Sequence, residues 1–277
     1  MTNYTKEKKQ KKDSVLLLTY NMTNTKIPHH KKIIQKLNYL FDSLHPKLKE
    51  ANPIISGSYA INLLFKPTSP YKDIDFYFQT EEDFIKAADC FFDVGADRVT
   101  ANKNCVIYEI NGFQYQLITR SFSTPFELIT DHDFYNSAIA IQNENIFLLK
   151  NLIPLYNDDL LEFQNIHFYN YETPEKQISG FNTFFNRILK YLNRYDFDLS
   201  EKAMKDLNNI SIWLDKKIED PAYNQITAKT NMYYNLTYSE TNTQQISFCD
   251  LVSKFKFFID SLNPAQSLED LHESILF

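Results

Sequence analysis

Glycine and cysteine are scarce in this chain of 277 residues, and long apolar runs are absent. The three cysteines, Cys90, Cys105 and Cys249, are odd in number and lack Cys-x-x-Cys spacing, which disfavours both a disulfide framework and a zinc site. Charged or amide residues interrupt every apolar run well short of the length that crosses a bilayer, so we expect no membrane span. The scarcity of glycine, with many Asn, Lys, Ile, Phe and Tyr residues, is typical of a codon bias and excludes no function. These absences predict a soluble protein of a reducing compartment, the cytoplasm.

The composition supports packed cores. Hydrophobic residues make up 43% of the chain and aromatic residues 15%, which disfavours general disorder. The length suits one large domain or two of ordinary size, and we favour two.

The net charge of −6 argues against a surface devoted to nucleic acid, although a local basic patch could still bind RNA or nucleotide phosphates. Residues 1–26 carry five lysines between positions 6 and 12, and we expect a basic, flexible N-terminal arm there.

In the first half of the chain, patterns typical of helices and strands alternate. Residues 73–78 read DIDFYF, an apolar strand, and residues 80–92 form a helix pattern in which Thr80 is the expected N-cap. Asn111-Gly112 joins two β-rich runs and is a strong hairpin signal. This alternation predicts an α/β (α+β) fold over residues 27–172. The other expected elements are helices at 32–44, 60–65 and 124–129 and strands at 54–56, 105–110, 113–120 and 137–141.

The second half changes to long helices. In residues 181–195 the apolar side chains fill one helical face, and residues 200–219 and 246–263 are further helix candidates. We therefore predict an all-helical C-terminal domain over residues 173–277, with the boundary near Tyr171–Pro174.

Two aspartates lie in the middle of the strand pattern DIDFYF. Alternate side chains of a strand face opposite ways, so Asp73 and Asp75 share one face while Ile74 and Phe76 share the other. Two like charges side by side repel and lose hydration, which calls for a compensating cation. Mg²⁺ typically takes one or two carboxylates and completes its shell with water and substrate phosphates. Asp73 and Asp75 are therefore predicted metal ligands, for Mg²⁺ or Mn²⁺.

A Gly-Ser pair, Gly57-Ser58, precedes an apolar helix pattern upstream of the aspartates. The N-terminus of a helix offers free backbone N–H groups, glycine allows close approach of a ligand, and the serine hydroxyl adds a donor. Gly57 and Ser58 are therefore candidates for binding a triphosphate. Taken alone, Ser58 is an equally good helix N-cap.

Together, SGSYAINLL and KDIDFYF resemble the nucleotidyltransferase superfamily of DNA polymerase β, whose pattern is a Gly-Ser at a helix start followed by a strand with two alternate aspartates. The resemblance covers approximately residues 54–141. It implies a nucleotidyltransferase-type core with a mixed sheet and a helical domain behind it. It also implies transfer of a nucleoside monophosphate from an NTP, with Asp73 and Asp75 binding the metals and Gly57 and Ser58 binding the phosphates.

The superfamily's usual third carboxylate is hard to assign here. On the expected neighbouring strand the polar face carries Gln114 and Gln116, which cannot act as a base. Asp133 precedes the predicted strand at 137–141 and is our candidate for the third catalytic acid, although an Asx turn is the commoner role of such an aspartate. Glu109, beside the predicted hairpin turn, is the alternative.

Arg187, Lys190 and Arg194 fall on one face of the predicted helix at 181–195, bordered by Tyr191. We interpret Arg187, Lys190 and Tyr191 as candidate binders of the triphosphate or of an RNA backbone. A solvated helix face is the alternative. The histidines show no ligand spacing and are expected at the surface.

The leading hypothesis is an Mg²⁺-dependent nucleotidyltransferase that acts on an RNA end, a protein or a small molecule. Toxin-like or defence-associated transferases that modify tRNA, and synthases of nucleotide second messengers, are rivals within the enzyme class. The missing third acid favours a different class, a catalytically degenerate nucleotidyltransferase fold that binds nucleotide, RNA or another protein.

Overall fold

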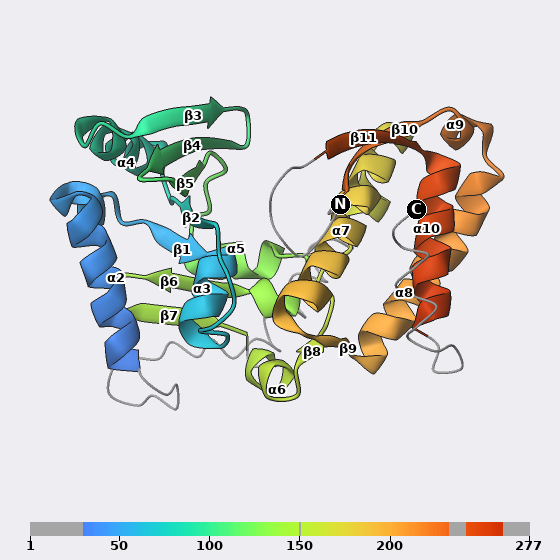
Figure 1. Cartoon of the computed structure of the whole chain (residues 1–277), viewed down its shortest axis with the longest axis horizontal. Coiled ribbons are helices and arrows are strands. Elements are labelled where there is room, and N and C mark those ends of the chain that lie inside the picture. The colour runs from blue at the N-terminus through green and yellow to red at the C-terminus, as the bar shows by residue number, and fades with distance from the viewer. Residues whose placement is uncertain (1–29, 150, 233–241, 263–277) are drawn as a thin grey trace, which may run out of the picture. The chain divides into compact units, whose positions relative to one another are not determined.

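The computed structural model describes residues 30–149, 151–232 and 242–262 (Figure 1). These residues form two compact units, and the chain passes from the first to the second between Asp158 and Asp159. This point lies earlier than the predicted position near Tyr171–Pro174. The reason is that strand β8 (Leu160–Leu161) pairs in parallel with β9 (Asp198–Leu199) within the second unit. The predicted N-terminal arm, residues 1–26, lies outside the described residues.

The first unit is built on a seven-stranded sheet with the order β3-β4-β5-β2-β1-β6-β7. β2 and β5 are parallel, whereas the other neighbouring strands are antiparallel. The sheet is therefore mixed, and the predicted α+β fold class is confirmed. The strands are β1 (Ile54–Ser56), β2 (Asp73–Tyr77), β3 (Asp97–Ala101), β4 (Cys105–Ile110), β5 (Phe113–Ile118), β6 (Ile139–Gln142) and β7 (Asn145–Leu148).

The aromatic core of this unit lies on the sheet face that carries Phe76. The Phe76 ring contacts Phe41 of α2, Phe91 of α4 and Tyr115 of β5, with ring centroids 6.2 to 6.5 Å apart. α2 and α4 therefore pack on this face, whereas the opposite face of β2 carries Asp73, Asp75 and Tyr77, whose ring packs against Phe122. The helices of the unit are α2 (His30–Leu44), η1 (Pro46–Ala51), α3 (Gly57–Leu64), α4 (Glu81–Asp93), α5 (Pro125–Asp131), η2 (Tyr135–Ser137) and α6 (Leu152–Asn157).

Local signals in the sequence set the ends of several elements. The Thr80 hydroxyl accepts a hydrogen bond from the backbone N–H of Asp83, which confirms Thr80 as the N-cap of α4. Asn111 and Gly112 both have positive φ, 53° and 76°, as a type I′ hairpin turn requires. The predicted hairpin of β4 and β5 is therefore confirmed.

The second unit is mainly helical. α7 carries the predicted apolar face, with Phe181, Phe184, Phe185 and Ile188 buried. Two small sheets, β8 with β9 and the hairpin of β10 with β11, were not predicted, because their segments are too short or too polar to show an apolar period. The elements are η3 (His167–Asn170), α7 (Pro174–Tyr195), α8 (Glu201–Ile218), α9 (Pro221–Asn224), β10 (Thr227–Met232), β11 (Asn242–Ser247) and α10 (Phe248–Ser261). No helix in the described parts of the chain combines the length and apolarity that a membrane span needs.

Candidate active site

The two aspartates of β2 lie on one face of the sheet. Ile74 and Phe76 are buried, with 2% and 0% of their surface exposed, whereas Asp73 and Asp75 are half-buried. This alternation agrees with the predicted strand. The carboxylates therefore face away from the aromatic core and are partly exposed.

The register of the sheet places polar residues of the neighbouring strands β1 and β5 directly beside the two aspartates on this face. Asp75 lies opposite Ser56 of β1 and Gln116 of β5, and Asp73 lies opposite Gln114 of β5. Directly opposed residues of neighbouring strands point to the same face and lie about 5 Å apart. The strand next to the aspartates thus presents two amides where the superfamily pattern leads one to look for an acid.

Two neutral donors hold the Asp73 carboxylate. Gln116 Nε2 donates to Asp73 Oδ2 at 2.6 Å, and Ser58 Oγ donates to Oδ1 at 3.3 Å. A carboxylate has about four acceptor sites, so both oxygens keep lone pairs for a cation. Because neither donor is charged, the negative charge of Asp73 is not cancelled by these contacts.

Ser58 is not the N-cap of α3. The helix begins at Gly57, and its N-cap is Ser56, whose side chain makes no capping hydrogen bond. Ser58 lies within the first turn, with its hydroxyl directed at Asp73. The interpretation of Ser58 as a cap is therefore wrong, and its role in phosphate binding stays a prediction.

Gly57 closes the site beside Asp75. Its φ is +73°, and a Cβ atom at this position would lie 2.5 Å from Asp75 Oδ2. An L side chain is strained at this φ, and any side chain would collide with the carboxylate. Only glycine fits the start of α3 against Asp75.

His132 is a residue of this face that the sequence analysis missed. Ser56 is fully buried, and its Oγ donates to the carbonyl oxygen of Ile139 at 2.6 Å and lies 3.1 Å from His132 Nε2. Since the serine has one proton to donate, we assign Nε2–H of His132 as the donor to Ser56 Oγ. The expectation of a surface histidine is wrong for His132, because α5 ends at Asp131 and returns the next residue to the sheet. No sequence motif predicts this contact, because it joins residues that lie 76 positions apart in the chain.

Replacing Ser56 by alanine should destabilise the first unit. Ser56→Ala leaves the Ile139 carbonyl and the His132 ring without this partner, and an unsatisfied buried group costs about 1–3 kcal/mol. Chemical denaturation of the variant measures the loss. Ser58→Ala is the matched control, since Ser58 is half-buried and makes one long hydrogen bond. Equal stability of the wild type and Ser56→Ala would contradict the assigned contacts.

The third acid is not brought together with the aspartate pair. The described residues include no group of three His, Cys, Asp or Glu side chains placed to hold a metal ion jointly. Asp133 is half-buried between α5 and η2, and its role as the third catalytic acid stays a prediction. Glu109 of β4 pairs with Gln114 of β5, and Gln114 pairs with Asp73 of β2. The strand β5 therefore separates Glu109 from Asp73.

The donor set of this face fits a hard divalent cation. It consists of two half-buried carboxylates on alternate residues of one strand, with a serine hydroxyl and a glycine backbone beside them. Mg²⁺ binds through one or two carboxylates and keeps positions for water and phosphate oxygens. Asp73 and Asp75 are the residues that would hold it.

The other predicted nucleotide-binding residues lie on α7 in the second unit. Arg187 is exposed and Lys190 is half-buried. Tyr191 is buried, and its ring lies 5.4 Å from that of Tyr195, so it contributes to the packing of α7. Nucleotide binding by Arg187, Lys190 and Tyr191 stays a prediction.

Comparisons with known proteins give partial matches. A family model described as "Gabija anti-defense 2 family protein" matches residues 28–153, the range that holds all strands of the large sheet. None of the curated proteins matches the chain.

Solved structures also match at low sequence identity. A "tRNA-processing enzyme (apo form I)" is 14% identical, with a TM-score of 0.49 over 69% of this chain and 50% of that chain. A CCA-adding enzyme in complex with CTP is 16% identical, with a TM-score of 0.49 over 67% of this chain and 44% of that chain. A Thermotoga maritima CCA-adding enzyme complexed with tRNA is 16% identical, with a TM-score of 0.45 over 68% and 50%. The match spans about half the length of these proteins.

Proposed function

We propose that this chain is a divalent-metal-dependent nucleotidyltransferase, which transfers a nucleoside monophosphate from an NTP to a hydroxyl acceptor. The observation that carries the proposal is the shared face of Asp73 and Asp75, closed by Gly57 and Ser58 at the start of α3. Neither half of this arrangement is specific alone. Their direct contact, Gly57 against Asp75 and Ser58 against Asp73, is what a site for a metal-bound triphosphate requires.

Each residue has a defined task in such a site. Asp73 and Asp75 hold the metal, which when bound neutralises phosphate charge and favours ionisation of the attacking hydroxyl. Ser58 and Gln116 fix the Asp73 carboxylate by hydrogen bonds. The free backbone N–H groups of the first turn of α3 bind phosphate oxygens. Rate enhancement then comes mostly from positioning and charge neutralisation.

Asp133 is the residue that we propose for accepting the acceptor's proton. If Asp133 is the base, Asp133→Asn should retain NTP binding and lose transfer, because an amide cannot accept that proton. Glu109→Gln is the matched comparison, because Glu109 is the alternative acid and is separated from Asp73 by one strand, β5. Normal transfer by Asp133→Asn with a dead Glu109→Gln would reverse the assignment.

A second function is favoured by one specific observation. Gln114 and Gln116 occupy the strand beside the aspartates, and neither can accept a proton as a base. Two glutamines in place of an acid on this strand are what we expect of a fold that binds NTP or RNA without transferring a nucleotide. Binding without incorporation of label distinguishes it from the enzyme.

The match of residues 28–153 to the Gabija anti-defense 2 family model supports a role in countering a defence system. We propose that the transfer reaction serves that role, by modifying an RNA, a protein or a small molecule. Synthesis of a nucleotide second messenger is the alternative, in which the acceptor hydroxyl belongs to another nucleotide.

Incubation with each α-labelled NTP and Mg²⁺, with and without total RNA, tests the function. We expect label from one or more NTPs to enter an RNA, protein or small-molecule fraction, and EDTA to prevent it. The fraction that carries the label identifies the class of acceptor, and the NTP that supplies the label identifies the nucleobase that is transferred. Binding of NTP with no labelled product under any of these conditions would contradict the enzyme and support the binding module.

A further inference from the structure

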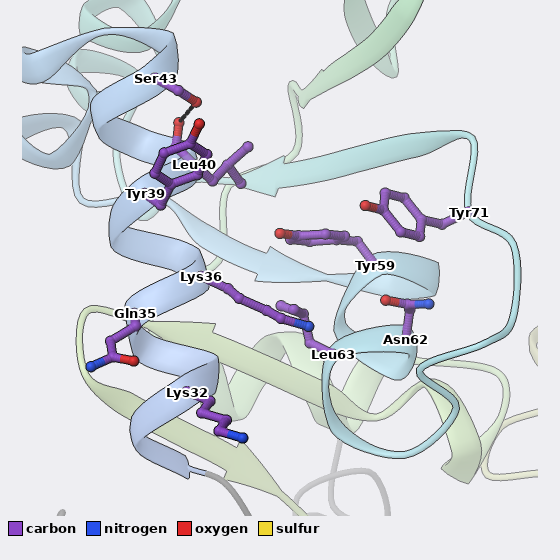
Figure 2. A pocket seen from close by; sticks show the side chains of 10 residues that line it. All are labelled: Lys32, Gln35, Lys36, Tyr39, Leu40, Ser43, Tyr59, Asn62, Leu63 and Tyr71. Carbon is purple, nitrogen blue, oxygen red and sulfur yellow. Dashed lines mark hydrogen bonds between the residues drawn. The ribbon is translucent and has the colours of Figure 1, made fainter.

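A pocket of about 650 Å³ lies between α2 and α3, beside the loop that leads into β2 (Figure 2). This volume is in the range of small-molecule sites, about 300–1,000 Å³. Its lining includes lysines from α2, Tyr59 and Asn62 from α3, and Tyr71 from the loop. The lining thus combines lysines and tyrosines with the apolar Leu40 and Leu63.

This pocket differs from the aspartate site. Ser58 and Tyr59 are consecutive residues of α3, yet the Ser58 hydroxyl reaches Asp73 while the Tyr59 ring lines the pocket. Asp73 and Asp75 do not contribute to its lining. The first turn of α3 therefore contacts two separate sites.

The Tyr59 hydroxyl has no hydrogen-bond partner among the residues that the structure describes. Only 6% of the Tyr59 surface is exposed, and no residue in the described ranges forms a hydrogen bond with its hydroxyl. Because its oxygen atom is not fully buried, the hydroxyl is accessible at the pocket although most of the Tyr59 ring is buried. Burial, with Tyr71 and Tyr115 nearby, raises the pKa of Tyr59, so the group stays protonated and can donate. A ligand oxygen in the pocket can accept this hydrogen bond.

Lys32 and Lys36 supply positive charge at the same place. They are four residues apart on α2, and both line the pocket. Neither forms an ion pair with any described residue. Like charges at this spacing repel on a helix, and a bound anion would relieve the repulsion. Lysine ammonium groups and the Tyr59 hydroxyl are all donors to phosphate oxygens, and all three line this pocket.

The remaining lining offers an aromatic surface and an acceptor. The rings of Tyr59 and Tyr71 meet edge to face with centroids 4.9 Å apart. Asn62 Nδ2 donates to the carbonyl oxygens of Lys66, Pro67 and Ser69, which holds its nitrogen toward the loop. Figure 2 shows the Asn62 oxygen on the side of Tyr59 and the lysines. This oxygen can accept a hydrogen bond from an amino group, and a planar ring can pack against the tyrosines.

We propose that the pocket between α2 and α3 binds a nucleotide, with its phosphate on Lys32, Lys36 and the Tyr59 hydroxyl and its base against Tyr71 and Asn62. The ligand is either a free mononucleotide or the phosphorylated end of a nucleic-acid strand, since both present the same chemistry. Binding here needs no metal and does not depend on the proposed transfer reaction.

Calorimetric titration of the full chain in EDTA tests the proposal, because EDTA removes the metal that nucleotide binding at Asp73 and Asp75 requires. One arm uses AMP and the other a short 5′-phosphorylated oligoribonucleotide. Tyr59→Phe should weaken binding about fivefold without lowering the thermal midpoint, since it removes only an unpartnered hydroxyl. Lys32→Ala/Lys36→Ala should weaken it at least about tenfold at low salt.

Lys31→Ala/Lys47→Ala is the matched control, because it removes the same charge from exposed positions outside the pocket. Selective loss by the pocket variants in the AMP arm identifies a mononucleotide site, and selective loss in the oligonucleotide arm alone identifies a strand end. The absence of binding in both arms would overturn the proposal, as would equal losses in the pocket and control variants. Binding in EDTA by a chain that transfers no nucleotide would support the pocket while the transfer function fails.

Discussion

Asp75→Asn should abolish nucleotide transfer while the protein remains folded. The substitution keeps the shape of the side chain and removes one of the two charges that hold the metal. Loss of about 4 kcal/mol of transition-state stabilisation corresponds to roughly a thousandfold lower rate. Asp73→Asn should have a similar effect, since Gln116 and Ser58 fix Asp73 but supply no charge. Removing either charge also relieves repulsion within the pair, so stability should not fall.

Transfer of labelled nucleoside monophosphate and thermal melting of the same samples measure these two effects. Asp97→Asn provides the matched control, because Asp97 is an exposed aspartate of β3 on the same sheet. The control should keep its transfer activity. Near wild-type transfer by Asp73→Asn or Asp75→Asn would refute the catalytic assignment.

Gly57→Ala is the second change with a large expected effect. The new Cβ atom would lie 2.5 Å from Asp75 Oδ2, so the carboxylate must move to make room. A displacement of about 1 Å in a catalytic group lowers rates by roughly a hundredfold, and we expect a loss of that order. The left-handed backbone of Gly57 adds a stability cost of about 1–2 kcal/mol.

Gly112→Ala separates these two contributions. Gly112 has a similar φ of +76°, but a Cβ atom there would have no neighbour within 4 Å. Both variants should therefore lose stability in denaturant titrations, Gly57→Ala at least as much as Gly112→Ala, while only Gly57→Ala should lose transfer. Equal activity of the two variants would show that the contact between Gly57 and Asp75 is not part of the site.

Patterns that depend on neighbouring residues in the chain predicted much of this fold. Strand alternation predicted that Asp73 and Asp75 lie on one face of the strand and Ile74 and Phe76 on the other, and the structure agrees. The Thr80 cap and the Asn111-Gly112 turn were also predictable, since each satisfies a local backbone requirement.

Contacts across the sheet were not predictable in the same way. The contact of Ser56 with His132 spans 76 positions, and that of Gln116 with Asp73 spans 43. The first depends on the pairing of β1 with β6 and the second on the pairing of β2 with β5, and no single segment encodes either pairing. The position of Ser58 in α3 also needed the structure, because Ser56, two residues earlier, is an equally good candidate for the cap.

Gln116 contacts Asp73 through an amide that has nearly the same shape as a carboxylate. Glutamine and glutamate codons differ by one base, so a single mutation would place an acid beside Asp73 without moving the backbone of β5. The same step in reverse removes the acid just as readily. A chain with this sheet can therefore gain or lose an acid at position 116 while the fold and the pair on β2 persist.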